Sequence, residues 1–257
     1  MRNIKKLTLS LLAVVAVSTW NTTFADDLVL EVLTGEEATY DAPFVGDCHK
    51  IGDGKVIVSG NGAAGNMANL ELSGGWVQIA DANSMPSVVT YDTNADNTFE
   101  VNVPGGADAS DLVMTQPGKL LCTTPANLYS VTGTGLLSID GSEAAIVAGD
   151  LSASATPVTV DAGALMQVGG VGHKATAGVT TIDGKLEILA APVAGAIPGL
   201  TTVDAAGVIE VDAGVTVPAL GGSDIFTNNG LKFGNNAVLR LRNGSTWNRA
   251  ITVGSFN

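Results

Sequence analysis

The chain has 257 residues, a formal net charge of −13 and a hydrophobic content of 46%. This apolar content argues against an intrinsically disordered chain, and the negative charge makes nucleic acid and anionic membranes poor partners. Charged residues make up only 14% of the chain and aromatic residues 5%, whereas glycine occurs 32 times. Together with many Val, Thr, Asp and Asn residues, this composition favours short strands and tight turns over long helices.

Residues 1–25 have the layout of a secretory signal peptide. Three cationic residues come first, an apolar run extends from Leu7 to Val17, and Thr23 and Ala25 occupy positions −3 and −1 of a cleavage site. The alternative interpretation is a buried N-terminal helix. Cleavage before Asp26 would leave nine Lys and Arg residues against 25 Asp and Glu residues, a net charge of −16. We expect an exported protein without a membrane span, located at the cell surface, in the outer membrane or outside the cell.

Residues 26–127 contain several predicted strands but no fixed spacing between them. The clearest strand candidates are 28–33, 55–58, 70–72, 76–79 and 99–103. We interpret this region as an irregular N-terminal β region that caps the second half of the chain. A separate β domain that ends near Pro125 is the alternative.

The two cysteines, Cys48 and Cys122, predict one disulfide, because the chain is expected to be exported. Such a bond would stabilise the fold by about 4 kcal/mol through the loop that it closes. The alternative is two buried thiols. Cys48 precedes His49, but neighbouring residues on a strand point to opposite faces, so this pair is poorly placed for nucleophilic catalysis.

The second half of the chain contains a repeat in which a hydroxyl residue, a β-branched residue, an aspartate and a small residue follow one another. The four copies are Leu137-Ser138-Ile139-Asp140-Gly141, Val158-Thr159-Val160-Asp161-Ala162, Thr180-Thr181-Ile182-Asp183-Gly184 and Thr201-Thr202-Val203-Asp204-Ala205. Their aspartates recur about every 21 residues, a period typical of solenoid repeats. A second apolar stretch follows each copy, at residues 145–147, 165–168, 186–189 and 208–211.

A unit of strand, turn, strand and loop is too small to hold a core, so consecutive units must stack on one another. We therefore predict an all-β protein in which residues 128–257 form a right-handed parallel β-helix, or β-solenoid, with rungs of about 21–22 residues. An antiparallel sandwich is the alternative, although the turns of such folds usually recur at roughly 8–12 residues without a longer period.

The four repeat aspartates, Asp140, Asp161, Asp183 and Asp204, would then lie in one column about 4.8 Å apart. They are interpreted as turn residues whose carboxylates bond to nearby backbone, and Ca²⁺ binding along the column is the alternative. Because no other chemical cluster stands out, we expect no catalytic, metal-binding or cofactor-binding residues. Arg240 and Arg242 share a strand face and are interpreted as solvent-exposed.

The second half resembles the passenger domains of Gram-negative autotransporters. The features that carry the resemblance are the signal peptide, the T-(I/V)-D-(A/G) turns and the segment from Gly244 to Gly254, in which Trp247 precedes an apolar stretch. The resemblance covers residues 128–257 and implies a surface-exposed β-helix.

These features lead to three functional hypotheses. The preferred one is an exported passenger or adhesin-like module that binds a surface glycan or protein through its solenoid and performs no catalysis. The first alternative is a self-assembling fibre or coat subunit, since an open strand edge can bind another copy. The second alternative is a secreted polysaccharide-active enzyme, because parallel β-helices also carry such activities.

Overall fold

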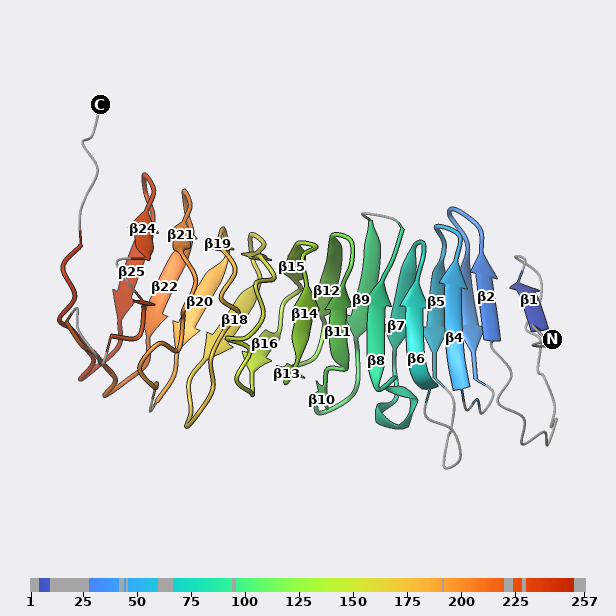
Figure 1. Ribbon diagram of the computed structural model, residues 1–257, viewed down its shortest axis with the longest axis horizontal. Coiled ribbons are helices and arrows are strands. Elements are labelled where there is room, and N and C mark those ends of the chain that lie inside the picture. The colour runs from blue at the N-terminus through green and yellow to red at the C-terminus, as the bar shows by residue number, and fades with distance from the viewer. Residues whose placement is uncertain are drawn as a thin grey trace.

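A computed structural model describes residues 5–9, 28–41, 44, 46–59, 67–93, 96–190, 192–219, 224–227 and 230–251. The fold is an all-β solenoid, drawn out into a rod with the two chain ends at opposite ends (Figure 1). A 3-10 helix, η1 at Ala82–Ser84, interrupts the strands. Within the described ranges, no helix is long and apolar enough to cross a lipid bilayer.

Three parallel sheets, which we name A, B and C, form the sides of the rod. Sheet A contains β1 (Lys5–Leu9), β2 (Leu28–Val32), β4 (Gly46–Ile51), β6 (Met67–Leu72), β8 (Val88–Tyr91), β11 (Asp111–Met114) and β14 (Val131–Gly133). Sheet B contains β3 (Glu37–Tyr40), β5 (Lys55–Val58), β7 (Trp76–Ile79), β9 (Asn97–Val101), β12 (Gly118–Cys122), β15 (Leu137–Asp140), β17 (Val158–Val160), β19 (Thr180–Ile182), β21 (Thr201–Val203) and β24 (Leu231–Phe233). Sheet C contains β10 (Ala107–Asp108), β13 (Ala126–Leu128), β16 (Ala144–Val147), β18 (Leu165–Val168), β20 (Lys185–Ile188), β22 (Val208–Val211) and β25 (Val238–Leu241). A separate pair joins β23 (Thr216–Val217) to β26 (Thr246–Trp247).

The predicted solenoid is confirmed, and its period follows the repeat. Leu137 pairs with Val158, Val158 with Thr180, and Thr180 with Thr201, so each repeat stacks on the next in register. The second strands of the units pair in the same way in sheet C. The next step along sheet B, from Thr201 to Leu231, takes more residues, because the connection that precedes β24 is longer.

The N-terminal half belongs to the same solenoid and differs from the irregular cap that we predicted for residues 26–127. Lys55 pairs with Trp76 and Trp76 with Thr98, and these steps have the same length as those of the C-terminal repeat. Sheet B continues without interruption from β3 to β24, so no boundary separates the halves at residue 127. The two halves differ in the sheet that lies beside sheet B. Sheet A lies beside it up to β14, and sheet C lies beside it from β10 onward. β1 falls within the predicted signal peptide and pairs with β2.

The core is built from columns of apolar side chains that point into the rod. One column of sheet B runs through Val56, Val77, Phe99, Leu120 and Ile139, all fully buried and paired from rung to rung. Burying one such side chain contributes about 1.5–3 kcal/mol, and only stacking provides this burial. The β-branched residues of the repeat suit this position, because they pack well on a pleated surface.

Two threonines in the core break the apolar pattern. Thr180 and Thr201 face inward, are 1% and 0% exposed, and pair with each other across β19 and β21. Their Oγ1 atoms have no hydrogen-bond partner among the described residues. A buried hydroxyl without a partner lowers stability, because it has lost its bonds to water.

Thr180→Val and Thr201→Val should therefore each raise the free energy of unfolding, by about 1 kcal/mol. Urea denaturation followed by circular dichroism measures the effect. The control is Thr181→Val, since Thr181 points outward and its replacement should change stability little. A loss of stability in both core variants would contradict the view that these hydroxyls are unsatisfied.

The predicted disulfide is wrong, because Cys48 and Cys122 are both free, buried thiols. Cys48 lies in β4 of sheet A, and Cys122 lies in β12 of sheet B. The strand β11 directly precedes β12 in the chain and is three strands beyond β4 in sheet A, so the two cysteines are three rungs apart along the rod. Three rungs amount to about 14 Å, whereas a disulfide requires Cα atoms within about 7 Å. Burial raises the pKa of each thiol to about 12, so neither is a reactive thiolate.

A buried lysine replaces an apolar side chain near the N-terminal end. Lys50 is 0% exposed and stands in the core column between Leu30 and Leu72. Its Nζ donates hydrogen bonds to the backbone oxygens of Ile51 at 3.0 Å, Gly52 at 2.5 Å and Gly74 at 3.1 Å. Burial lowers the pKa of Lys50 to about 8, although nearby acidic groups act in the opposite direction.

This depressed pKa predicts an alkaline gain in stability. Between pH 8 and 10.5 the unfolded chain keeps a proton on Lys50 that the folded chain has released, so stability rises with pH. The buried thiols act oppositely above about pH 9, because only the unfolded chain ionises them there. The contribution of Lys50 is therefore measured by comparing the pH dependence of the free energy of unfolding in the native protein and in Lys50→Met. Across this pH window, Lys50 should increase the stability of the native protein on the order of 2 kcal/mol. Parallel pH dependences of the two urea midpoints would disprove it.

Candidate functional site

The outer face of sheet B carries two aligned columns of polar side chains in its C-terminal half. The first, which we name the hydroxyl column, begins with Lys119 and continues with the hydroxyl residues Ser138, Thr159, Thr181 and Thr202. These five residues pair in register from rung to rung. The second, which we name the aspartate column, consists of Asp140, Asp161, Asp183 and Asp204. The backbone N–H groups of Asp161, Asp183 and Asp204 each donate to the rung before, so the four residues occupy equivalent positions.

Lys119 neutralises one end of the aspartate column. Its Nζ lies 2.7 Å from Oδ2 of Asp140 and 3.7 Å from Oδ2 of Asp161. The hydrogen bond to Asp140 raises the pKa of Lys119, and the same bond lowers the pKa of Asp140. Asp140 also accepts a hydrogen bond of 2.7 Å from the backbone of Gly141, which is the turn role expected from the sequence. Asp161 accepts one of 2.6 Å from Ser138.

The other end of the column has no such cation. Asp183 and Asp204 have no ion-pair partner among the described residues, and the pKa of Asp183 is raised by burial and by repulsion from Asp204 and Asp161. Within the described part of the chain, no group of three or more His, Cys, Asp or Glu side chains is arranged to hold a metal ion. The column is therefore a row of turn carboxylates that carries unbalanced charge at Asp183 and Asp204.

Asp183→Asn should stabilise the protein by about 0.5 kcal/mol at neutral pH and low salt, because it removes repulsion at a partly exposed position. High salt should reduce this gain. Since the folded-state pKa of Asp183 is raised, the repulsion is lost as the pH falls and Asp183 becomes protonated. Asp161→Asn is the matched control and should give no gain, because Asp161 is bonded to Ser138 and lies near Lys119. Thermal unfolding at two salt concentrations distinguishes the two variants.

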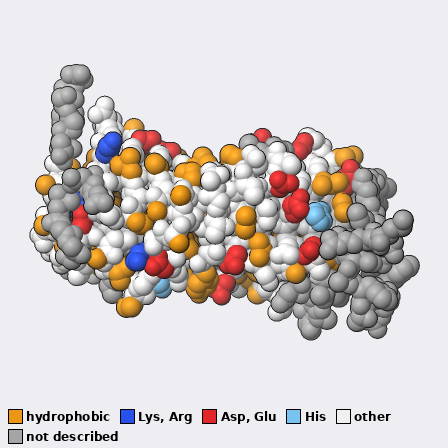
Figure 2. All heavy atoms as spheres, viewed as in Figure 1, with side chains coloured by type: hydrophobic (Ala, Val, Ile, Leu, Met, Phe, Trp, Pro, Cys, Tyr) orange, Lys and Arg blue, Asp and Glu red, His pale blue; other side chains and the backbone are white. Residues whose placement is uncertain are grey.

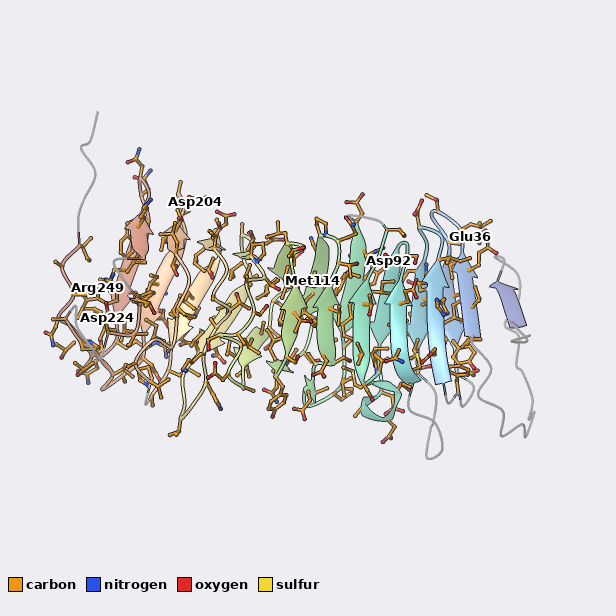
Figure 3. All side chains as sticks on the ribbon, in the orientation of Figure 1. Glu36, Asp92, Met114, Asp204, Asp224 and Arg249 are labelled. Carbon is orange, nitrogen blue, oxygen red and sulfur yellow. The ribbon has the colours of Figure 1, made fainter. Side chains whose placement is uncertain are left out.

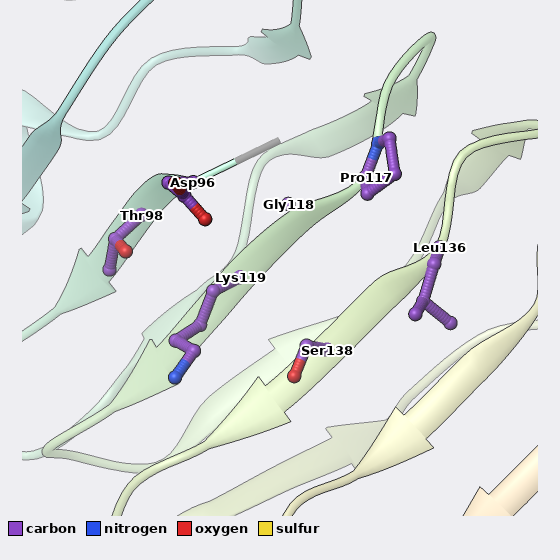
Figure 4. Close-up of a pocket in the computed structure, with 7 residues that line it drawn as sticks. All are labelled: Asp96, Thr98, Pro117, Gly118, Lys119, Leu136 and Ser138. Atoms are coloured by element: carbon purple, nitrogen blue, oxygen red, sulfur yellow. The ribbon is translucent and has the colours of Figure 1, made fainter. Parts of the chain in front are cut away.

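A shallow hollow of about 290 Å³ lies on the same face, next to Lys119 (Figure 4). Strands β9, β12 and β15 form its floor, and its polar lining comes from Asp96, Thr98, Lys119 and Ser138. Pro117, Gly118 and Leu136 complete the lining. The hollow is continuous with the hydroxyl column, since Lys119 and Ser138 belong to both.

Toward the N-terminus, a network around Glu100 continues the face. Glu100 is almost fully buried and accepts a hydrogen bond of 2.9 Å from the indole Nε1 of Trp76. Lys55 places its Nζ 3.2 Å from Glu100 and 4.2 Å from the centre of the Trp76 ring. Thr123 donates a further hydrogen bond of 3.2 Å to Glu100. These contacts hold the Trp76 side chain in place beside Thr98 and the hollow.

Arg240 and Arg242 lie over sheet C and are solvent-exposed, as expected, but both are also held in ion pairs. Arg240 donates to Glu210 at 2.8 Å, and Arg242 contacts both Glu210 and Glu187. Burial alone would raise the pKa of Glu210, but hydrogen bonds from the two arginines hold it at about 2.

Sequence reasoning misses these acids, because it begins the second strand of one repeat at Leu186, whereas that strand begins at Lys185. With the observed register, Gln167, Glu187, Glu210 and Arg240 align in one column. Gln167 donates a hydrogen bond of 2.7 Å to Glu187 within it.

The adjacent Cys48 and His49 point to opposite faces, as strand geometry predicts. Cys48 is buried in the core, whereas His49 is partly exposed and lies 3.1 Å from Glu71 on the outside of sheet A. His173 lies in a loop, where its Nδ1 is 2.7 Å from the backbone oxygen of Gly169.

Comparisons of the chain with family models, curated proteins and solved structures found no match. A functional proposal therefore has to come from the geometry of the solenoid, above all from the outer face of sheet B.

Proposed function

We propose that this chain is an exported, surface-presented binding module that holds an extended neutral glycan against the outer face of sheet B, without catalysis. The observation that carries the proposal is the hydroxyl column. Thr159, Thr181 and Thr202 are half-buried, and their hydroxyls have no hydrogen-bond partner among the described residues. They are therefore free to bond to a ligand.

The spacing of these groups favours a ligand with a repeat of its own. Each rung offers one hydroxyl and one carboxylate, and the pair recurs about every 4.8 Å along the rod. Carboxylates and hydroxyls accept hydrogen bonds from sugar hydroxyls, and carboxylates form the stronger ones. The hollow beside Lys119 adds a donor at one end of the row. A polyanionic glycan is disfavoured, because aspartates line the same face.

Export and surface display are part of the proposal and are supported by sequence features. The cationic start, apolar run and small residues before Asp26 support secretion, and the resemblance to autotransporter passengers supports presentation at a cell surface. An exposed rod suits this role, because it presents one long face to a partner.

Replacing the free hydroxyls should weaken binding without unfolding the protein. The double variant Thr159→Val and Thr181→Val keeps the shape and the strand preference of both side chains but removes two donors. Its Kd for a neutral glycan should rise about tenfold or more, since each hydrogen bond contributes about 0.5–1.5 kcal/mol. Ligands would be found on an array of neutral and anionic glycans, and affinities would be measured by calorimetry.

The matched control is Thr90→Val, which makes the same change on the outer side of sheet A. It should leave the affinity unchanged. Failure of the native protein to bind any neutral glycan, or equal losses in the control and the double variant, would refute a binding site on sheet B.

A further inference from the structure

The outer face of sheet B carries a third column, which we name the apolar column. Its members directly precede strands β12, β15, β17, β19 and β21, and they are Pro117, Leu136, Pro157, Val179 and Leu200. The backbone oxygens of the last four each accept a hydrogen bond from the rung before, so these residues occupy equivalent positions. Pro117 holds the same position one rung earlier, since strand β12 pairs in register with strand β15.

The apolar column lies beside the hydroxyl column over the same length of the rod. Each of its members stands two residues before a member of the hydroxyl column, and residues two apart on a strand point to the same face. Two such positions are about 6.6 Å apart. Figure 4 shows the arrangement at one end, where Pro117 and Leu136 line the same hollow as Lys119 and Ser138.

The side chains of the apolar column are open to solvent. Leu136 is 38% exposed, Val179 48% and Leu200 37%, whereas Pro117 and Pro157 are half-buried. Of the nine large apolar side chains that are exposed in the described part of the chain, three therefore stand in this one row. Single exposed apolar residues are normal on a protein surface, but a contiguous apolar patch indicates a surface that binds a partner.

The aspartate column borders the hydroxyl column on its other side. In the rungs of β15, β17, β19 and β21, an apolar group, a hydroxyl and a carboxylate thus follow one another across the face, and Figure 3 marks the last of these carboxylates, Asp204. A sugar ring is divided in the same way, because its hydroxyls surround the rim and its C–H groups lie on the two faces. A ring whose C–H face rests on the apolar column can therefore turn rim hydroxyls toward the hydroxyl column.

The alignment of the columns narrows the class of glycan. In-register pairing places successive members about 4.8 Å apart in one row, a step similar to the length of one sugar in an extended chain. Hexoses with equatorial hydroxyls and β-linkages form straight, flat chains, whereas α-linked glucose chains coil away from a straight row. A charged chain is disfavoured, because acidic side chains outnumber basic ones in this protein, as the view in Figure 2 also shows.

We propose that the apolar column and the hydroxyl column together bind a straight, β-linked chain of neutral hexoses. The C–H face of each sugar packs on the Leu, Val or Pro side chain of one rung, and its rim hydroxyls bond to the Ser or Thr of that rung. This inference rests on the proposed function and specifies its ligand. Because one sugar occupies one rung, the affinity should increase with chain length until the five rungs from β12 to β21 are covered.

Calorimetry with cello-oligosaccharides and malto-oligosaccharides tests the proposal, because both series consist of glucose and differ in linkage. The native protein should bind cellopentaose about tenfold more tightly than maltopentaose, since only the β-linked chain follows the row. Its affinity should also rise from cellobiose to cellopentaose.

Removing apolar contacts should weaken this binding. The double variant Val179→Thr and Leu200→Thr keeps a strong strand preference at both positions but makes them polar. Its Kd for cellopentaose should rise about tenfold, because two side chains no longer cover C–H groups. The matched control is Leu33→Thr and Val238→Thr, which replaces two similarly exposed side chains in the turn after β2 and on sheet C. It should leave the affinity unchanged, and circular dichroism would check that both double variants are folded.

The outcomes separate this inference from the proposed function. Equal affinities for the two glucose series would overturn the inference alone. The same holds for a Kd that rises with the loss of the Thr159 and Thr181 hydroxyls but not with the loss of the Val179 and Leu200 side chains. Absence of binding to every neutral glycan would overturn both proposals.

Sedimentation velocity tests the other possible occupant of the apolar column, a second copy of the chain. The native protein should have the same oligomeric state as Val179→Thr with Leu200→Thr. A native oligomer that this double variant dissociates, while its affinity for cellopentaose stays unchanged, would assign the apolar column to self-association and contradict the inference.

Discussion

The constraint on which the whole molecule depends is the in-register parallel pairing of each rung with the next. Backbone hydrogen bonds between rungs place every residue directly over its equivalent in the preceding rung, so one choice of side chain is repeated as a column. The apolar core, the aspartate column and the hydroxyl column are three results of that rule. The same rule makes an error costly, because a polar side chain at an inward position cannot turn away from its buried neighbours.

The sequence predicts this fold best where the chain repeats itself most closely. The (S/T)-(I/V)-D motif located β15, β17, β19 and β21, because turn, pleat and core all require the same residue types there. In the N-terminal half the period is equally present but hidden. Inward positions require only an apolar residue, and outward positions vary freely, as in the column from Trp76 through Thr98 to Lys119. The change from sheet A to sheet C further obscures the alignment.

The polar site was predictable only where all its members came from the repeat. Spacing alone identified Asp140, Asp161, Asp183 and Asp204, but their cation Lys119 lies one rung before the first motif. The prediction of a disulfide between Cys48 and Cys122 failed for a related reason. Their separation in the sequence places them several rungs apart along the rod, and both thiols are free. In a solenoid, residues meet when they occupy equivalent positions in neighbouring rungs, and residues several rungs apart do not meet.

Because sheet C replaces sheet A along the rod, the mechanical strength of the contact between neighbouring rungs varies along its length. Within the described residues, sheet B continues from β3 to β24, and sheets A and C are both present beside it between β10 and β14. In that stretch sheets A and C overlap for a short distance, while sheet B continues past both of them. Outside it, neighbouring rungs are held by fewer regular backbone hydrogen bonds. Because each rung contacts only its neighbours, a rod under tension parts where the fewest bonds cross, so the overlap is its strongest segment.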